Sequence, residues 1–347
     1  MAGRSVGART WALPSRPVIA GAANAAGRKE GEGPLKDTFD AVCPDDTFGQ
    51  SSWEKAESEM QRLAITGALA RAGISPERLS ALFAGDLLNQ CIGSSFAART
   101  LGAPYLGLYG ACSTMGEALT LAALTVDGGY GDWAAAAASS HFCTAERQYR
   151  TPLEYGCQRP PTTQWTVTGA GAVVLAREGK GPRVTHVTPG RVVDLGITDT
   201  NNMGAAMAPA AHDTLSAHFQ DTGRSPADYD LILTGDLGDL GRQLLLELFA
   251  RDGVDLSPNC TDCGLLIYDR ERQDVHCGGS GCGCSAAVFT GHILRGMTAG
   301  RWRRVLFCPT GALHSPTSAL QGESIPGICH AVALEAPGRE EEDHGVS

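Results

Sequence analysis

A single cysteine, Cys112, lies where an apolar stretch of the chain gives way to an Ala/Leu-rich stretch, in GLYGACSTMGEALTLAALTV at 107–126. Residues 105–109 predict a short buried strand, and apolar residues then recur at helical spacing from Ser113 to Val126. Cys112 is therefore expected at a helix N-terminus, where unpaired backbone N–H groups and the helix dipole favour an anion and lower the pKa of a thiol. The alternative is an inert core thiol.

A cysteine nucleophile needs a base or a second polar partner. Histidines elsewhere in the chain are candidates by residue type, namely His141, His276, His292 and His314. His141 ends a strand of small residues predicted at 133–141, and it is the base that an acyl-transferring enzyme could use. A lone histidine is more often a core or surface residue, so residue type alone assigns none of them.

Five cysteines and His276 fall within residues 260–284, CTDCGLLIYDRERQDVHCGGSGCGC. A Cys-x₂-Cys pair followed by further thiols is one pattern of a zinc site. An apolar strand predicted at 265–268 separates that pair from the other thiols, and Cys282 and Cys284 form a poor chelating pair unless the loop bends. Buried, reduced thiols are therefore the better interpretation.

The glycine-rich loop 278–283 stands directly before an apolar helix predicted at 285–297. Such a loop can turn several backbone N–H groups toward an anion or a carbonyl oxygen, or it can be a tight turn that needs positive φ. It matches neither a Gly-Lys-Ser/Thr phosphate loop nor a Gly-x-Gly-x-x-Gly dinucleotide motif. Both interpretations of the loop stay open.

The elements that must position these residues alternate between strand and helix patterns, which favours an α/β fold. A helix is predicted at 53–72, with Ser51 and Glu54 at capping-box spacing and Gly73 as its stop. A second long helix is predicted at 207–219.

The pattern restarts after a joint at 178–181. An apolar run followed by Gly-Asp-Leu occurs at 82–88 and again at 231–240, at corresponding places in the two series of elements. Together these features favour a duplicated fold.

The chain has 347 residues and a net charge of −10, so on average it repels nucleic acid and anionic lipid. Neither a secretory signal nor a run of about 18 apolar residues is visible, so we expect synthesis in the cytosol and reduced cysteines. The acidic tail at 336–347 is predicted to be disordered.

Several blocks resemble the thiolase and β-ketoacyl synthase superfamily: the cysteine at a strand-to-helix turn, TVTGAGAVVLA closing the first half, and the glycine loop before a late helix. AGDLLNQ, PYLGLYGACST, TPLEYGCQRPPTTQWTVTGAGA and DCGLLIYDRERQDVHCGGSGCGCSA resemble the stage V sporulation protein AD family of spore-forming bacteria. The resemblance covers most of residues 11–335. It implies a five-layered αβαβα fold with two pseudo-twofold-related halves, 1–178 and 179–335, and a homodimer.

Condensing enzymes of this superfamily use a cysteine, a histidine and an asparagine. Cys112 matches the cysteine, but Gly235 and Asp236 stand where the histidine belongs, and Cys282 stands where the asparagine belongs. Loss of one such oxyanion-hole donor typically costs about 10²–10³ in rate. The departure from the motif therefore favours a degenerate active site, with Cys112 as a vestigial nucleophile.

The resemblance further implies a role in moving dipicolinic acid (pyridine-2,6-dicarboxylate) into the developing spore, with calcium carried by the ligand. It implies membrane-embedded stage V sporulation protein A subunits as partners and a peripheral location on the spore inner membrane. We expect dipicolinate to bind in the former active-site cleft, with no cofactor, no resident metal and no nucleic acid. Candidate ligand-binding residues are Cys112, Ser113, His141, Thr168, Gly169, Gly235, Asp236, His276, Gly281 and Cys282.

Asp236 is also a candidate oxygen ligand for calcium, although one carboxylate is few for an ion that takes six or more oxygens. Two other functions remain open at this point. One is an active condensing enzyme on acyl-coenzyme A or acyl-carrier substrates, using Cys112. The other is a scaffold for membrane channel subunits, in which the pocket is a vestige.

Overall fold

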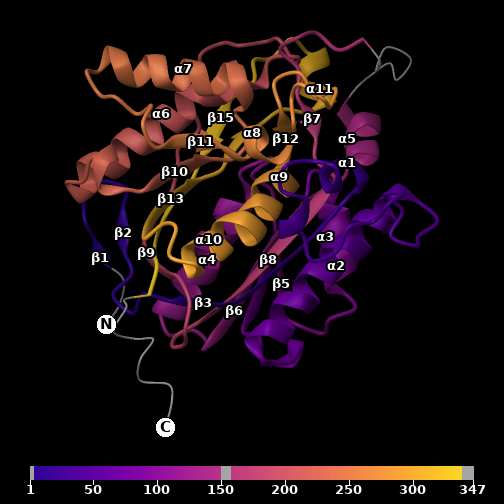
Figure 1. The fold of residues 1–347 in the computed structure, drawn as a ribbon, viewed down its shortest axis with the longest axis vertical. Coiled ribbons are helices and arrows are strands. Elements are labelled where there is room, and N and C mark those ends of the chain that lie inside the picture. Colours follow the sequence, from indigo (N-terminus) through magenta and orange to yellow (C-terminus); the bar gives the residue numbers. More distant parts are fainter. Residues whose placement is uncertain (1–3, 150–157, 338–347) are drawn as a thin grey trace.

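The computed structural model describes residues 4–149 and 158–337, and its centre is a large mixed sheet (Figure 1). The first half of the chain contributes five of its strands: β3 (Val18–Ala26), β4 (Ala81–Gly85), β5 (Tyr105–Leu108), β6 (Trp133–Ser140) and β8 (Gly169–Ala176). The second half contributes β9 (Arg183–Thr188), β10 (Leu231–Thr234), β11 (Cys260–Asp262), β13 (Arg304–Cys308) and β16 (Ala331–Glu335).

The two sets of strands pair in the same pattern. β4 is parallel to both β5 and β6, and β6, β8 and β3 follow in antiparallel order. Likewise β10 is parallel to both β11 and β13, and β13, β16 and β9 follow in antiparallel order. β3 and β9 join the two sets where Val18 pairs with Arg183. The duplicated α/β fold is therefore confirmed, while the division at residues 178 and 179 stays a prediction.

Helices form three layers around and between the two sets of strands (Figure 1). α2 (Trp53–Ala72) packs on β3 and β8, with α3 (Ile92–Ala98) beside it. α4 (Thr114–Asp127) and α9 (Cys282–Val288) contact each other in the middle layer. α6 (Met203–Thr222) and α7 (Gly238–Arg251) cover the second set. The layers give the αβαβα order that the resemblance implied.

Shorter elements connect these layers. The strands are β1 (Arg4–Ser5), β2 (Trp11–Ala12), β7 (Trp165–Thr166), β12 (Gly279–Ser280), β14 (Thr310–Ala312) and β15 (Gly327–Cys329). The helices are α1 (Arg28–Gly31), α5 (Phe142–Tyr149), α8 (Cys263–Ile267), α10 (Leu294–Thr298) and α11 (Pro316–Leu320). A π-helical turn at Phe289–Ile293 joins α9 to α10, so the predicted late helix is longer and less regular than expected.

Three local predictions were wrong in detail. The N-cap of α2 is Ser52, whose hydroxyl accepts the Lys55 N–H at 3.4 Å, rather than Ser51; Gly73 ends the helix in the left-handed conformation, as predicted. Residues 265–267 belong to helix α8, whose N-terminus is capped by the Asp262 side chain, rather than to a strand. β5 is partly exposed rather than buried because it forms one end of the sheet.

Residues from 338 onward, which include most of the predicted acidic tail, lie outside the described part of the chain. Among the described residues, no helix is both long and apolar enough to cross a membrane.

Candidate functional site

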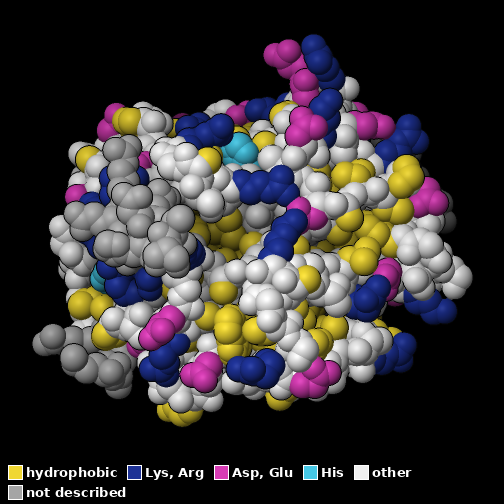
Figure 2. Space-filling model, turned by 60° about the horizontal axis from the view of Figure 1, so that its bottom comes forward, with side chains coloured by type: hydrophobic (Ala, Val, Ile, Leu, Met, Phe, Trp, Pro, Cys, Tyr) yellow, Lys and Arg dark blue, Asp and Glu magenta, His cyan; other side chains and the backbone are white. Residues whose placement is uncertain are grey.

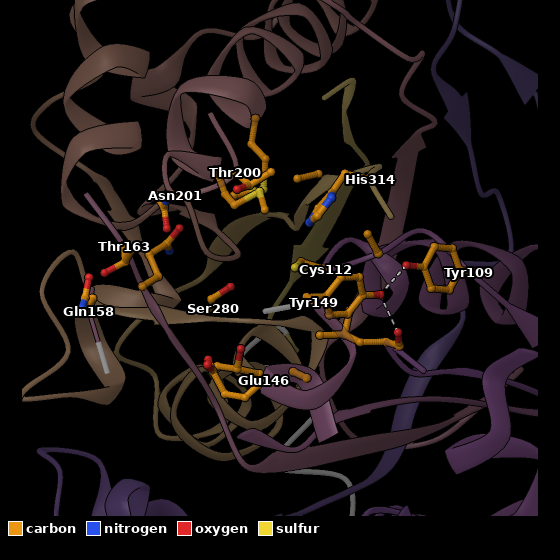
Figure 3. Close-up of a pocket in the computed structure, with 18 residues that line it drawn as sticks. Tyr109, Cys112, Glu146, Tyr149, Gln158, Thr163, Thr200, Asn201, Ser280 and His314 are labelled. Carbon is orange, nitrogen blue, oxygen red and sulfur yellow. Dashed lines mark hydrogen bonds between the residues drawn. The ribbon is translucent and has the colours of Figure 1, made fainter. Parts of the chain in front are cut away.

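A cavity of about 350 Å³ is lined by residues from both halves of the chain, and Cys112 is part of its wall (Figure 3). Most lining residues come from loops and element ends rather than from strand interiors. They are Leu87, Tyr109, Ala111, Cys112, Ala145, Glu146, Tyr149, Gln158, Thr163, Gln164, Thr166, Thr200, Asn201, Met203, Met207, Ser280, Ala312 and His314.

A tight turn between β5 and α4 carries Cys112. Ala111 has a φ of 50°, a left-handed conformation that is uncommon for a residue with a side chain. The carbonyl of Gly110 accepts the Ser113 N–H at 3.0 Å and the Ser113 hydroxyl at 2.7 Å, which closes the turn. Strand β14 backs the turn at Gly311, where a Cβ would lie 2.4 Å from the Gly110 oxygen. This packing fixes the turn that carries Cys112 at the cavity wall.

Asp236, which follows β10, lies directly beside Cys112. Asp236 is close enough to the Cys112 thiol for the two groups to influence each other's pKa. The Asp236 carboxylate accepts the Gly281 N–H at 2.8 Å and the Thr310 hydroxyl at 3.1 Å. Asp236 is fully buried, so its carboxyl group is held by the protein itself.

The electrostatics of this pair keep Cys112 protonated. Burial raises the pKa of the Cys112 thiol well above its usual value, and the charge of Asp236 raises it further. Burial also raises the pKa of Asp236 to about 7. The predicted lowering of the Cys112 pKa was therefore wrong, because desolvation and a neighbouring carboxylate outweigh the helix N-terminus.

The glycine-rich loop 278–283 is a tight turn rather than an anion cradle. Gly278 and Gly281 have φ values of 112° and 96°, which only glycine adopts readily. The Gly281 N–H is bound to Asp236, and the Gly283 N–H is bound to the Ser140 hydroxyl at 3.1 Å. At the start of α4 the N–H groups of residues 113 and 114 are bound to preceding carbonyls. Neither segment therefore presents these N–H groups to a ligand.

His141 does not line the cavity, and both of its ring nitrogens are hydrogen-bonded within the protein. Its Nδ1 accepts the Cys143 N–H at 3.1 Å, so its Nε2 carries the proton and donates to the Asp46 carbonyl at 2.9 Å. Burial lowers the pKa of His141. The arrangement contradicts the expectation that His141 contacts a ligand or serves as a base for Cys112.

Other predicted contact residues are also structural. Thr168 is buried, with its hydroxyl accepting the Phe142 N–H at 3.2 Å, and Gly169 of strand β8 pairs with the adjacent strands β3 and β6. The backbone carbonyl of Gly235 accepts the Cys284 thiol at 3.7 Å. His276 lies outside the cavity wall, 3.5 Å from Asp274. These residues support the site's frame and do not line it.

The cysteine-rich segment is buried and makes thiol-to-carbonyl hydrogen bonds. Cys282 donates to the Ser139 carbonyl at 2.9 Å, and Cys277 donates to the Pro161 carbonyl at 3.3 Å. Within the part of the chain that the structure describes, no group of three or more His, Cys, Asp or Glu side chains is arranged to hold a metal ion. The five cysteines are therefore buried packing groups, and the thiols of Cys277, Cys282 and Cys284 also donate hydrogen bonds to carbonyls.

The cavity wall contains two tyrosines that the sequence analysis did not identify. The Tyr149 hydroxyl donates to the Leu87 carbonyl at 2.6 Å, so it accepts from the Tyr109 hydroxyl at 2.8 Å (Figure 3). Both hydroxyl protons are thus used, and the pair offers lone pairs and aromatic faces to a ligand. Nothing in the local sequence marks either tyrosine, because each comes from a different loop or helix end.

His314 was considered only by residue type. Its Nδ1 is buried and has no hydrogen-bond partner, and its ring centroid lies 5.4 Å from that of Tyr149. Burial lowers its pKa, so the ring is neutral at pH 7. Among the described lining residues Glu146 is the acidic side chain and no Lys or Arg is present.

The fold and the cysteine-bearing cavity define a thiolase-like protein. 3-Oxoacyl-(acyl carrier protein) synthase III from Xanthomonas oryzae is similar over 92% of this chain and 98% of its own, with a TM-score of 0.59 and 17% identity. A variant of OleA from Xanthomonas campestris matches 92% of this chain and 96% of its own, with a TM-score of 0.60 and 17% identity. At these identities the likeness shows the fold alone.

The sequence comparisons are more specific. The stage V sporulation protein AD (SpoVAD) family matches residues 7–335. Stage V sporulation protein AD of Bacillus subtilis is 45% identical over 332 residues, covering 96% of this chain and 98% of that protein. The chain therefore belongs to the stage V sporulation protein AD family.

Proposed function

We propose that this sporulation protein binds dipicolinic acid in the Cys112 cavity, without covalent chemistry, for uptake into the developing spore. The observation that carries the proposal is the position of the buried Asp236 carboxyl group beside Cys112, where burial and the charge of Asp236 raise the pKa of the thiol. This arrangement keeps the thiol protonated and places a negative group where a condensing enzyme needs an oxyanion donor. The cavity therefore retains a binding volume but lacks the means to activate its cysteine.

The shape and lining of the cavity support a small, flat ligand. Its volume of about 350 Å³ lies at the lower end of the range for small-molecule sites. Tyr109, Tyr149 and His314 supply aromatic surface from three segments, and aromatic groups pack well against a planar ring. A pyridine ring with two carboxylates has the size and planarity that this lining favours.

The charge of the cavity indicates how such a ligand enters. No Lys or Arg is among its described lining residues, and Glu146 contributes an acidic group, so an unpaired dianion is disfavoured. A calcium chelate has its charge balanced before it binds. Tyr109, Gln164 and Asn201 line the cavity, and their side-chain oxygens are the type of ligand that calcium takes. We therefore propose the calcium chelate as the bound form.

Asp236 is not part of that proposed calcium shell. Its two oxygens already accept hydrogen bonds from Gly281 and Thr310, and it is fully buried. Calcium is then carried by the ligand rather than held at a resident metal site.

Strand β5 is the basis for a proposed dimer. Strand β5 ends the sheet, and Leu106 on it is 48% exposed, close in sequence to the exposed Phe96 and Tyr109. An exposed edge strand with apolar side chains favours pairing with a second copy. We propose a homodimer through β5, located peripherally at the spore inner membrane with other stage V sporulation protein A subunits as partners.

Isothermal titration calorimetry with dipicolinate, with and without calcium, tests the binding proposal. We expect saturable heat that is larger or appears at lower ligand concentration with calcium. Calcium chloride alone is the control, and it is expected to give no comparable heat. Absence of heat with millimolar calcium dipicolinate would contradict the proposal.

Acyl transfer is the alternative that the solved thiolase-like enzymes favour, because Cys112 still faces the cavity. Intact mass spectrometry after incubation with acetyl-coenzyme A separates the two functions. We expect no adduct. An adduct that disappears in Cys112→Ala would instead establish an acylated enzyme.

A scaffold for membrane channel subunits is the other alternative, and dipicolinate accumulation in spores tests it. If substitutions in the Cys112 cavity leave accumulation unchanged while substitutions in β5 abolish it, the scaffold function is favoured.

A further inference from the structure

A second hollow, of about 710 Å³, lies where β3, the segment 179–183 and α10 meet. We call it the β3/α10 groove. It shares no lining residue with the Cys112 cavity. Apolar atoms of Ile19, Ala22 and Leu294 contribute to its walls. On the face that Figure 2 brings forward, Lys and Arg side chains border hollows with hydrophobic walls.

Four cations from three segments line the groove, namely Arg71, Lys180, Arg183 and Arg295. They are concentrated there although the chain as a whole has a net charge of −10. The described lining of the Cys112 cavity has no Lys or Arg, so the two hollows differ in charge and select different ligands.

Two of the arginines are pre-organised by one carboxylate. Asp40 binds Arg71 at 2.6 Å and Arg295 at 2.6 Å, so a single negative charge serves two guanidinium groups. Arg71 also donates to the Ala22 carbonyl at 2.5 Å. Both arginine side chains are still about half exposed, at 49% and 46%. Fixed, partly exposed guanidinium groups with donors to spare suit a phosphate oxyanion.

The opposite rim is a glycine-built turn. Gly179 and Gly181 have φ values of 148° and 146°, and a Cβ on Gly181 would lie 2.4 Å from the Ile19 oxygen. Only glycine allows the turn to approach β3 this closely. The turn holds Lys180 and Arg183 at the rim, opposite the arginines on α2 and α10.

We propose that the β3/α10 groove binds the phosphate headgroup of an anionic phospholipid, with the apolar walls covering the part of the lipid next to the headgroup. Cations at the rim and apolar atoms on the walls match the two parts of an amphiphile. The attraction is local, because charges farther than a Debye length of about 8 Å are screened at physiological salt. Each rim cation near an anionic surface contributes about fivefold in affinity.

Co-sedimentation with lipid vesicles tests this proposal, using phosphatidylcholine vesicles with and without phosphatidylglycerol. We expect the full chain to bind only the vesicles that contain phosphatidylglycerol. Lys180→Glu/Arg183→Glu is expected to weaken binding tenfold or more. Arg78→Glu/Arg251→Glu changes the net charge equally at exposed positions that do not line the groove, and it is expected to bind nearly as the unmodified chain does.

Lys180→Glu alone covers the case in which the double variant folds poorly, because Lys180 is exposed in a turn. Equal binding to both vesicle types, or equal losses in the groove and control variants, would overturn the proposal.

Soluble competitors distinguish a bilayer lipid from a free anion. Water-soluble dihexanoyl phosphatidylglycerol is expected to release the protein from vesicles, whereas equimolar inorganic phosphate is not. Release by inorganic phosphate would make the groove a phosphate site and overturn the lipid assignment. Release by equimolar dipicolinate would make it a dicarboxylate site, with the same consequence. Neither result depends on whether the Cys112 cavity binds dipicolinate.

Discussion

Cys112 lies beside the buried carboxyl group of Asp236, and both groups hold their protons more tightly than usual. The sequence resemblance to condensing enzymes aligns Asp236 with their histidine. A neutral imidazole there donates an N–H to the developing oxyanion, whereas a carboxylate repels it. Asp236 therefore opposes the acyl transfer that a histidine at this position would support.

Asp236→Asn should make Cys112 more reactive. The amide keeps the size of the side chain but removes the negative charge that raises the Cys112 pKa. Each unit by which the pKa falls gives about tenfold more thiolate, so we expect alkylation by iodoacetamide at mildly alkaline pH to accelerate about tenfold. Mass spectrometry with peptide mapping measures it. Cys112→Ser in the same background assigns the label, and an unchanged alkylation rate at Cys112 would show that Asp236 does not control the thiol.

The protein should become less stable as the pH rises from about 7 to 9, above the range in which buried histidines with lowered pKa values, such as His218 and His330, oppose the trend. Burial raises the pKa of Glu30 to about 7, burial raises that of Asp236 to about 7, and burial and then the charge of Asp86 raise that of Glu57. The folded chain therefore binds these protons more tightly than the unfolded chain. Their stabilisation is complete below a pH of about 4 and is lost as the pH rises through the folded-state values.

Urea unfolding at several pH values measures this loss, which we expect to reach a few kcal/mol at about 1.4 kcal/mol per pKa unit. Glu57→Gln should flatten the pH dependence because the amide does not titrate. Glu59→Gln, on the partly exposed side of the same helix, is the matched control and should leave the slope unchanged. A free energy of unfolding that rises over this pH range would contradict the assignment.

His314→Ala should weaken calcium dipicolinate binding about tenfold, the usual effect of removing a hydrogen bond to a charged group. Its Nδ1 is buried and has no hydrogen-bond partner within the protein. A carboxyl group or the ring nitrogen of the ligand would form that hydrogen bond. His276→Ala is the control because His276 lies outside the cavity wall. Calorimetry compares the two variants, and equal affinities would remove His314 from the site.

Leu106→Glu should convert the proposed dimer into a monomer. It places a charge on the end strand β5, where the side chain is 48% exposed. Size-exclusion chromatography with light scattering reads the molar mass. Leu320→Glu, at a side chain that is 85% exposed in α11, should leave the mass unchanged. A monomeric unmodified chain would rule out the β5 dimer.

The sequence allowed much of the framework to be predicted. Helix α2 begins at Trp53 and ends at Ala72 as predicted, and α4 follows Cys112 as predicted, because apolar spacing and glycine stops are local signals. The two Gly-Asp-Leu segments follow β4 and β10, which occupy equivalent places in the two sets of strands. A repeated pattern of this kind can be recognised from one sequence alone.

The cavity wall could not be predicted in the same way. Tyr109, Tyr149 and His314 come from three segments, and only the folded chain brings them together. The Cys112 pKa was predicted in the wrong direction because the helix N-terminus is visible in the sequence, whereas burial and the Asp236 contact are tertiary. Similarly, the loop 278–283 has its N–H groups bound by Asp236 and Ser140 from distant segments.

The central claim is that dipicolinate occupies the Cys112 cavity, and calorimetry of two matched variants tests it most directly. Ala312→Phe places a ring in the cavity wall, whereas Ala299→Phe places the same ring in the β3/α10 groove. With thermal unfolding as a check that both variants fold, we expect calcium dipicolinate to bind Ala299→Phe like the unmodified chain and not to bind Ala312→Phe. Equal binding by the two variants would contradict the account, as would the absence of binding by the unmodified chain.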